Sequence, residues 1–187
     1  GFDLALPFSR NSTIFCNLDS DTLVSKKYLS AINHFFYNTK KIAAVTEFSH
    51  QVGKNKSQND AIKLYENFIR NTSKKLLECK SPYYYHAIGS TIVCRADAYS
   101  AVGGMPKKKA TEDFYFLQEL AKFCGVYTIP KILVYPSCRP ISRVYLGTGF
   151  RMKQAIEGFD INSLYYSKKS FMLLEEWIQL GINSWGI

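Results

Sequence analysis

The chain alternates short apolar runs with longer amphipathic segments, and this alternation constrains its fold more than any other feature. Apolar runs of this length favour buried strands, whereas apolar residues that recur with a helical period favour helices. The predicted strands are residues 12–18, 42–48, 88–95 and 126–136, the last being one strand or two, and the predicted helices are 25–38, 60–79, 110–125 and 168–181. Strands that alternate with helices predict an α/β fold, with a mixed sheet flanked by helices.

The bulk composition narrows the classes of function. The chain has 187 residues, of which 47% are hydrophobic and 21% charged, as in a folded domain. It contains no run of 18 apolar residues and no signal peptide pattern, so we expect no membrane span and a cytoplasmic location, which includes the inner face of the membrane. The net charge of +9 favours an anionic partner, but the lysines are scattered and we expect no nucleic acid. The five cysteines lack metal-ligand spacing and are predicted to be reduced thiols.

Two carboxylates follow the first predicted strand, in the stretch "NLDSDT" at 17–22. If the strand continued, Asp19 and Asp21 would share one face and repel each other unless a cation or donors lay between them. They could instead cap a turn or the following helix. A calcium loop is excluded, because Thr22 and Tyr28 stand where it needs glycine and glutamate. A site for a hard divalent ion completed by substrate phosphates remains, alongside the capping alternative.

A second acidic pair, Glu112 and Asp113, follows Thr111 at the start of a predicted helix. Acidic side chains in a first helical turn complement the helix dipole, which is a sufficient structural reason for them. The preceding stretch 102–106, "VGGMP", is predicted to be a loop.

Taken together, these motifs resemble the inverting family 2 glycosyltransferases of the GT-A fold. The resemblance is carried by "NLDSDT" at 17–22, "IGSTIVCRADAYSAVGGMP" at 88–106 and "TED" at 111–113. It covers roughly residues 10 to 150 and implies a partial GT-A domain over 1–150, with 151–187 as a C-terminal helical extension packing on it. In this fold most of the nucleotide-binding half precedes the Asp-x-Asp strand. We therefore expect this chain to be the catalytic-side portion of a longer glycosyltransferase, or a relative that lost its donor half. By itself it is expected to bind nucleotide sugars weakly and to be weakly active or inactive.

The resemblance also implies an activity, namely transfer of a sugar from a nucleotide-sugar donor to the hydroxyl of a glycan, lipid-linked or other acceptor. Asp21 would bind Mg²⁺ or Mn²⁺, and Asp19 would help hold the metal or the ribose. Asp113 would be the catalytic base, with Glu112 beside it orienting the acceptor. Further positions implied in donor or acceptor binding are Gly89, Ser90 and Thr91, and a basic loop over the diphosphate containing Arg139, Arg143, Gly147, Gly149 and Arg151. The Gln-x-x-Arg-Trp motif of processive synthases is absent.

Several alternatives stay open at this point. The aromatic stretch 83–86 could stack on a sugar or pack in the core. A sheet edge left exposed would lead to a homo-oligomer or be shielded by residues 1–10. The amphipathic helix at 168–181 is expected to pack on the domain rather than on a membrane. The alternative function is a non-catalytic module derived from a glycosyltransferase, which binds a glycan or a partner chain.

Overall fold

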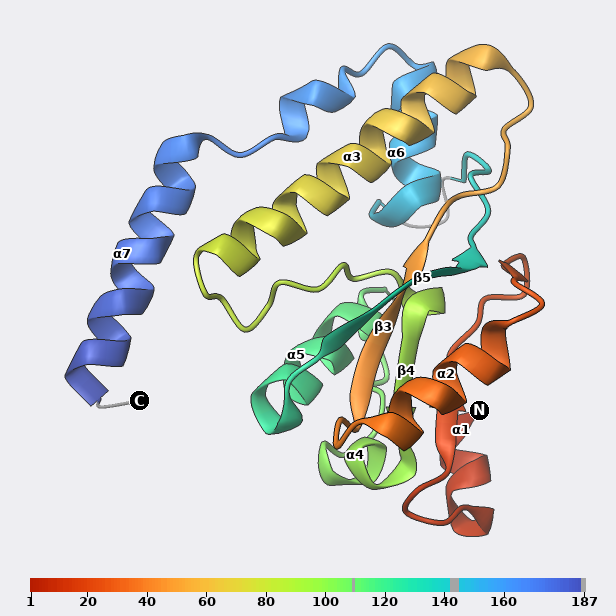
Figure 1. Cartoon of the computed structure of the whole chain (residues 1–187). Helices are drawn as coiled ribbons and strands as arrows, with labels where there is room; N and C mark the ends of the chain where they lie inside the picture. Colours follow the sequence, from red (N-terminus) through yellow and green to blue (C-terminus); the bar gives the residue numbers. More distant parts are fainter. Residues whose placement is uncertain (109, 142–144, 186–187) are drawn as a thin grey trace.

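The computed structural model describes residues 1–108, 110–141 and 145–185, and within them the fold is α/β (Figure 1). A five-stranded sheet has the order β1-β4-β3-β5-β2. The strands are β1 (Ile14–Cys16), β2 (Leu23–Val24), β3 (Ala43–Phe48), β4 (Ile92–Arg95) and β5 (Tyr127–Tyr135). β3 and β5 are parallel and the other neighbours antiparallel, so the predicted mixed sheet is confirmed.

All four predicted helices are present. They are α2 (Tyr28–Asn38), α3 (Lys56–Glu78), α5 (Glu112–Cys124) and α7 (Lys168–Trp185). Shorter elements are α1 (Phe2–Ala5), η1 (Leu6–Phe8), η2 (Gly89–Thr91), α4 (Ala96–Ala101), α6 (Gly147–Ile156) and η3 (Ile161–Leu164). α3 begins four residues before its predicted start because the Asn55 side chain accepts a hydrogen bond from Gln58 N and caps it. Among the described residues, none of the helices has the length and hydrophobicity needed to cross a bilayer.

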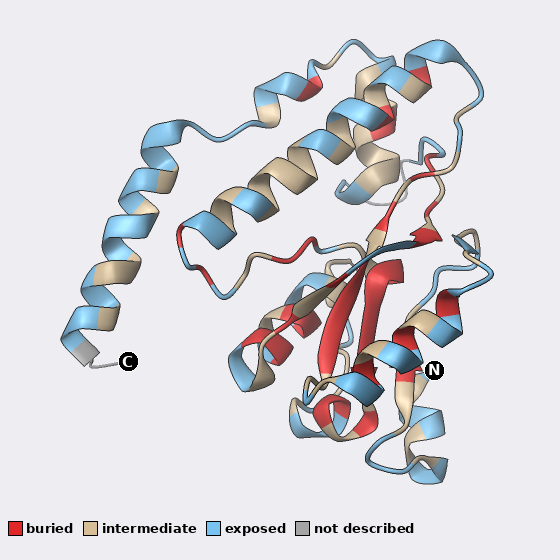
Figure 2. Ribbon diagram, viewed as in Figure 1, coloured by how far each residue is buried: buried red, intermediate tan, exposed pale blue. Residues whose placement is uncertain are grey.

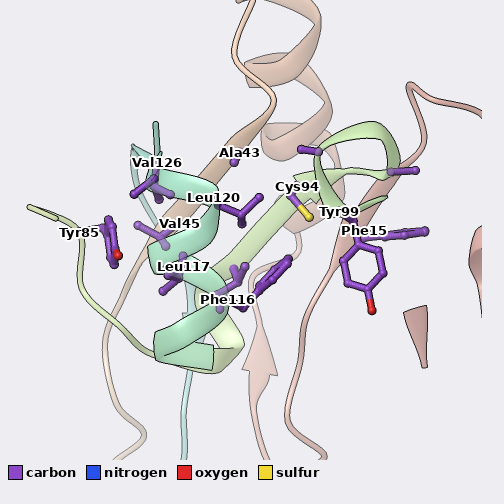
Figure 3. Packing of buried hydrophobic residues seen from close by; sticks show 14 residues of the cluster. Phe15, Ala43, Val45, Tyr85, Cys94, Tyr99, Phe116, Leu117, Leu120 and Val126 are labelled. Atoms are coloured by element: carbon purple, nitrogen blue, oxygen red, sulfur yellow. The ribbon is translucent and has the colours of Figure 1, made fainter. Parts of the chain in front are cut away.

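Helices cover both faces of the sheet, because alternate residues of each strand point to opposite sides. α2 packs on one face, where Ile32 is buried against Phe48 and Val134. α4 and α5 pack on the other, where the side chains of α5 meet the second set of strand residues (Figure 3). Each such fully buried side chain contributes about 1.5–3 kcal/mol to the stability of the fold. This packing holds α5 in place on the sheet.

The parallel pair β3–β5 contains an irregularity at Pro130. Thr46 pairs with Ile129 but the next residue, Glu47, pairs with Ile132, so residues 130 and 131 are extra. Proline has no N–H to donate to a ladder, which is why it stands at such a bulge.

The N-terminal segment folds back beside β1. The Phe2 ring stacks on Phe15 with 4.7 Å between centroids and meets Tyr99 edge-on at 5.4 Å. The Tyr99 hydroxyl also donates to Asp3 Oδ1 at 2.6 Å. Residues 2 and 3 therefore pack against Phe15 and Tyr99, whereas the shielding of a sheet edge by residues 1–10 stays a prediction. The homo-oligomer stays a prediction.

The C-terminal third divides into a packed part and an exposed part. α6 and η3 pack on α3, with Met152 buried beside Ile62 and Cys138. The predicted domain limit at residue 150 therefore falls inside α6. The segment predicted as a basic loop ends at Leu146, immediately before α6 begins. α7 is different, because none of its described side chains is buried and Trp177 is 73% exposed (Figure 2). The first turn of α7 does contact the end of α3, because Cys79 Sγ donates to Phe171 O at 3.3 Å. The expectation that the rest of this helix packs on the domain stays a prediction.

Candidate functional site

The chain turns sharply after β1, and this turn carries both carboxylates of the first motif. β1 ends at Cys16, and Thr22 N donates to Asp19 O at 3.1 Å to close the turn. The two aspartates therefore do not extend a strand, and the argument that they share a strand face is wrong. Gln51 holds the turn against the end of β5, because its Nε2 donates to Asp21 O and Tyr135 O, each at 2.7 Å.

Asp19 is attached to η2, the 3-10 turn that precedes β4. Ser90 Oγ donates to Asp19 Oδ2 at 2.6 Å, lies 2.8 Å from Thr22 Oγ1, and accepts from Asp19 N at 3.3 Å. Ser90 is completely buried, so it supports the turn from the protein interior and does not contact a ligand directly. Thr91 is also completely buried and donates to Ile88 O at 2.7 Å. The predicted ligand contacts of Ser90 and Thr91 are therefore not supported by this geometry.

Gly89 is the point where the two acidic motifs meet. A Cβ atom added to Gly89 would lie 3.3 Å from Asp113 Oδ2 and 3.6 Å from Asn17 Nδ2. Asn17 Nδ2 in turn donates to Gly89 O at 3.1 Å. The absence of a side chain at Gly89 lets the Asp113 carboxylate approach the backbone of η2, beside the residue that binds Asp19.

Asp113 lies in the first turn of α5, where its environment changes its acidity. Burial raises the pKa of Asp113; the hydrogen bond from Phe114 N opposes this, and the charges of Glu112 and Asp19 raise the pKa further. The effect of Asp19 means that the two motifs are electrostatically coupled. A carboxyl with a raised pKa beside other acids has the properties of a general base. Thr111 precedes the helix in a left-handed conformation, but its side chain makes no capping bond.

Basic residues approach the site from the segment after β5. Arg139 Nη2 donates to Asp21 Oδ2 at 2.6 Å, and the Arg139 side chain is 62% exposed. An exposed pair of this kind contributes about 0–1 kcal/mol, so the guanidinium is easily released to another anion. Arg143 lies outside the described residues. Arg151 is in α6 and donates to Gln154 Oε1 at 2.7 Å.

The two glycines of the predicted basic loop are in α6. Gly147 begins the helix with a φ of 82°, in the left-handed region. At Gly149 a Cβ would lie 3.1 Å from Arg139 O and 3.2 Å from Ile141 N. Gly149 therefore allows the segment that carries Arg139 to run directly against α6.

The described residues contain no group of three or more acidic, histidine or cysteine side chains arranged to hold a metal by themselves. Magnesium, however, is commonly held by one or two carboxylates together with substrate phosphates. Asp19 and Asp21 use Oδ2 in the bonds described above and lie in one short turn with their charges near the surface. In number and type, two carboxylates in one turn match what magnesium takes from a protein when phosphates supply its other ligands.

Next to this site lies a charge network that the sequence did not suggest. Glu66 Oε1 accepts from His50 N at 2.6 Å and lies 2.9 Å from His50 Nδ1, and Arg70 Nη1 donates to Glu66 Oε2 at 2.8 Å. His50 Nε2 lies 3.1 Å from Thr148 Oγ1, at the start of α6. Only the spacing of Glu66 and Arg70, four residues apart on one helix, was visible in the sequence.

The aromatic stretch 83–86 belongs mostly to the interior. Tyr85 is buried in the core cluster beneath α5 (Figure 3), and His86 is buried with Nε2 2.9 Å from Thr46 O. Tyr83 and Tyr84 are partly exposed. The core alternative thus describes Tyr85 and His86 better than the stacking alternative.

No family model, curated protein or solved structure matches this chain. The assignment of a function therefore depends on the motifs and on the contacts that the fold creates between them.

Proposed function

We propose that this chain is the catalytic-side portion of a metal-dependent inverting glycosyltransferase with a GT-A-like arrangement. The observation that carries the proposal is the meeting at η2, where Ser90 binds Asp19 and the adjacent Gly89 lies against Asp113. Residues that the chain separates widely thus form one acidic site.

The arrangement assigns a separate role to each side of the site. Asp19 and Asp21 would hold the metal, which stabilises the charge that develops on the leaving diphosphate. Arg139 can move from Asp21 to a phosphate oxygen, because a guanidinium binds phosphate with two parallel hydrogen bonds. The donor sugar would then lie over η2, where Gly89 leaves room beside Asp113.

Asp113 would complete the reaction on the opposite side of the sugar. It accepts the proton of the acceptor hydroxyl while the acceptor oxygen forms its bond to the anomeric carbon. The bond from that carbon to the diphosphate breaks with its electron pair, and a nucleoside diphosphate leaves. Because attack and departure occur in line, the anomeric configuration is inverted.

The test is release of nucleoside diphosphate from a panel of UDP- and GDP-sugars with Mn²⁺ and saccharide acceptors. We expect Asp113→Asn to lower turnover by on the order of a hundredfold or more, because a positioned base is lost. Glu119→Gln is the matched control, since Glu119 is an exposed acid on the same helix, paired with Lys122 at 2.7 Å. Equal turnover in both variants would overturn the proposal, and so would an unmodified protein that neither turns over a nucleotide sugar nor binds Mn²⁺ together with UDP or GDP.

A second candidate function is glycan binding without transfer. The observation in its favour is the ion pair between Asp21 and Arg139. Because Arg139 already supplies a positive charge beside Asp21, this carboxylate does not require a metal ion. Under this alternative, saccharides bind but Mn²⁺ and nucleotides change neither affinity nor spectra.

A further inference from the structure

An aromatic pocket of about 400 Å³ lies beside the candidate base. Its wall is formed by α3, by the segment 83–87 and by the first two turns of α5. The side chains that give it its character are aromatic, namely Tyr65, Phe68, Tyr83, Tyr85, Phe114 and Tyr166. Pockets of this size accommodate small ligands.

The pocket is next to Asp113 through Phe114. Phe114 lines the pocket, and its N–H donates to Asp113 Oδ1 at 2.7 Å. Asp113 does not itself line the pocket, but it is the neighbour of Phe114 at the start of α5. A molecule in the pocket would therefore lie one residue along α5 from the carboxylate that is proposed to remove a proton.

The aromatic rings form a connected surface that is partly open to solvent. Phe68 stacks on Tyr65 at 6.2 Å between centroids, and its ring centroid is 6.2 Å from that of Tyr166. Phe114 and Tyr166 are exposed, Tyr166 by 60%. Exposed rings gathered around a hollow are typical of a binding surface, whereas rings that only stabilise a core are covered.

The polar groups of the wall narrow the chemistry of the ligand. Thr72 and Gln118 also line the pocket. The Tyr85 hydroxyl is buried and has no hydrogen-bond partner among the described residues. A wall that combines ring faces with donors and acceptors matches a sugar ring, whose faces are apolar and whose edge carries hydroxyls. A long aliphatic chain would leave these polar groups unpaired.

We propose that this pocket binds the acceptor as a sugar ring, stacked on an aromatic side chain, with one hydroxyl directed to Asp113. This inference rests on the proposed function and names its acceptor class, a pyranoside. Tyr166 is the residue to test, because its high exposure allows truncation without loss of the fold.

The experiment measures binding of methyl pyranosides, namely glucoside, galactoside, mannoside and N-acetylglucosaminide, by saturation-transfer NMR without nucleotide. We expect Tyr166→Ala to weaken binding of the preferred pyranoside by about fivefold to tenfold and to raise its KM as acceptor equally. Tyr166→Phe keeps the ring and should retain most of the affinity. Tyr37→Ala, which removes an 85% exposed tyrosine of α2, is the control and should change nothing.

The outcomes separate the two proposals. If pyranosides bind and Tyr166→Ala weakens their binding, but neither turnover nor binding of Mn²⁺ with UDP or GDP is detected, the pocket stands and the proposed transferase function fails. If transfer occurs and Tyr166→Ala behaves like Tyr37→Ala, the transferase stands and the pocket assignment is wrong. Transfer to a polyprenyl phosphate in preference to every pyranoside would likewise overturn the pocket assignment.

Discussion

Glu66 is expected to stabilise the fold strongly, and to do so only above acidic pH. Burial alone would raise its pKa, but hydrogen bonds from His50 and Arg70 outweigh burial and lower the pKa from 4.5 to about 2. A difference of about 2.5 pKa units corresponds to about 3 kcal/mol at 1.36 kcal/mol per unit. The Glu66 side chain is only 13% exposed, so solvent screens this contribution little.

The direction of the pH dependence follows from linkage. A carboxyl whose pKa is lower in the folded state binds fewer protons there, so its stabilisation is complete above pH 4.5. The stabilisation is lost as pH falls from 4.5 through about 2. Glu66→Gln should therefore lower the free energy of unfolding by about 1–3 kcal/mol at pH 7 and by much less near pH 3.

Urea denaturation followed by far-UV circular dichroism at pH 7, 5 and 3 measures this difference. The matched control is Glu78→Gln, on the same helix, where the exposed Glu78 pairs only with Lys75 at 2.7 Å and no change is expected. If Glu66→Gln and Glu78→Gln were equally stable, or if the loss at Glu66 were the same at all three pH values, the reasoning would be refuted.

Two further predictions concern packing. Gly89→Ala should lower the rate of transfer by on the order of tenfold and leave the free energy of unfolding nearly unchanged, because the added Cβ would displace Asp113 Oδ2. Gly181→Ala, whose added Cβ would have no atom within 4 Å, is the control for the turnover assay. Trp177→Ala should leave the denaturation midpoint unchanged because the side chain is exposed. Leu120→Ala, in the core, should lower the free energy of unfolding by about 2–5 kcal/mol. A destabilised Trp177→Ala would contradict the exposed position of Trp177.

Local patterns were sufficient to predict most of the fold. The helical spacing of apolar residues located α2, α3, α5 and α7, and the apolar runs located β3 and β5. The 88–95 run proved to contain η2 followed by a shorter β4. Here Gly89 starts the turn that brings the backbone to Asp113, a contact that depends on a distant residue.

α6 escaped prediction for a related reason. Gly147 and Gly149 are typical of a loop, but α6 forms because Met152 is buried against α3 and Gly149 admits the backbone of Arg139. For α7 the amphipathic pattern correctly predicted a helix, but a period only locates an apolar face and does not identify the surface that the face covers.

The motifs identified candidate site residues, but their partners required the fold. The sequence pointed to Asp19, Asp21 and Asp113 by type and spacing. It could not show that Ser90 is buried beneath Asp19, or that Glu66, His50 and Thr148 connect α3 with α6. Such contacts are formed by side chains that are far apart in the chain and have no common period.

The central claim is that the two acidic motifs form one site for a divalent ion and a diphosphate. Paramagnetic line broadening tests it directly, by titrating Mn²⁺ into ¹⁵N-labelled protein in the presence of UDP or GDP. We expect the strongest broadening at the amides of 19–22, 89–91 and 112–113, and its loss in Asp21→Asn. Broadening centred on another acidic position, such as Glu175 and Glu176 of α7, or unchanged broadening in Asp21→Asn, would contradict the claim.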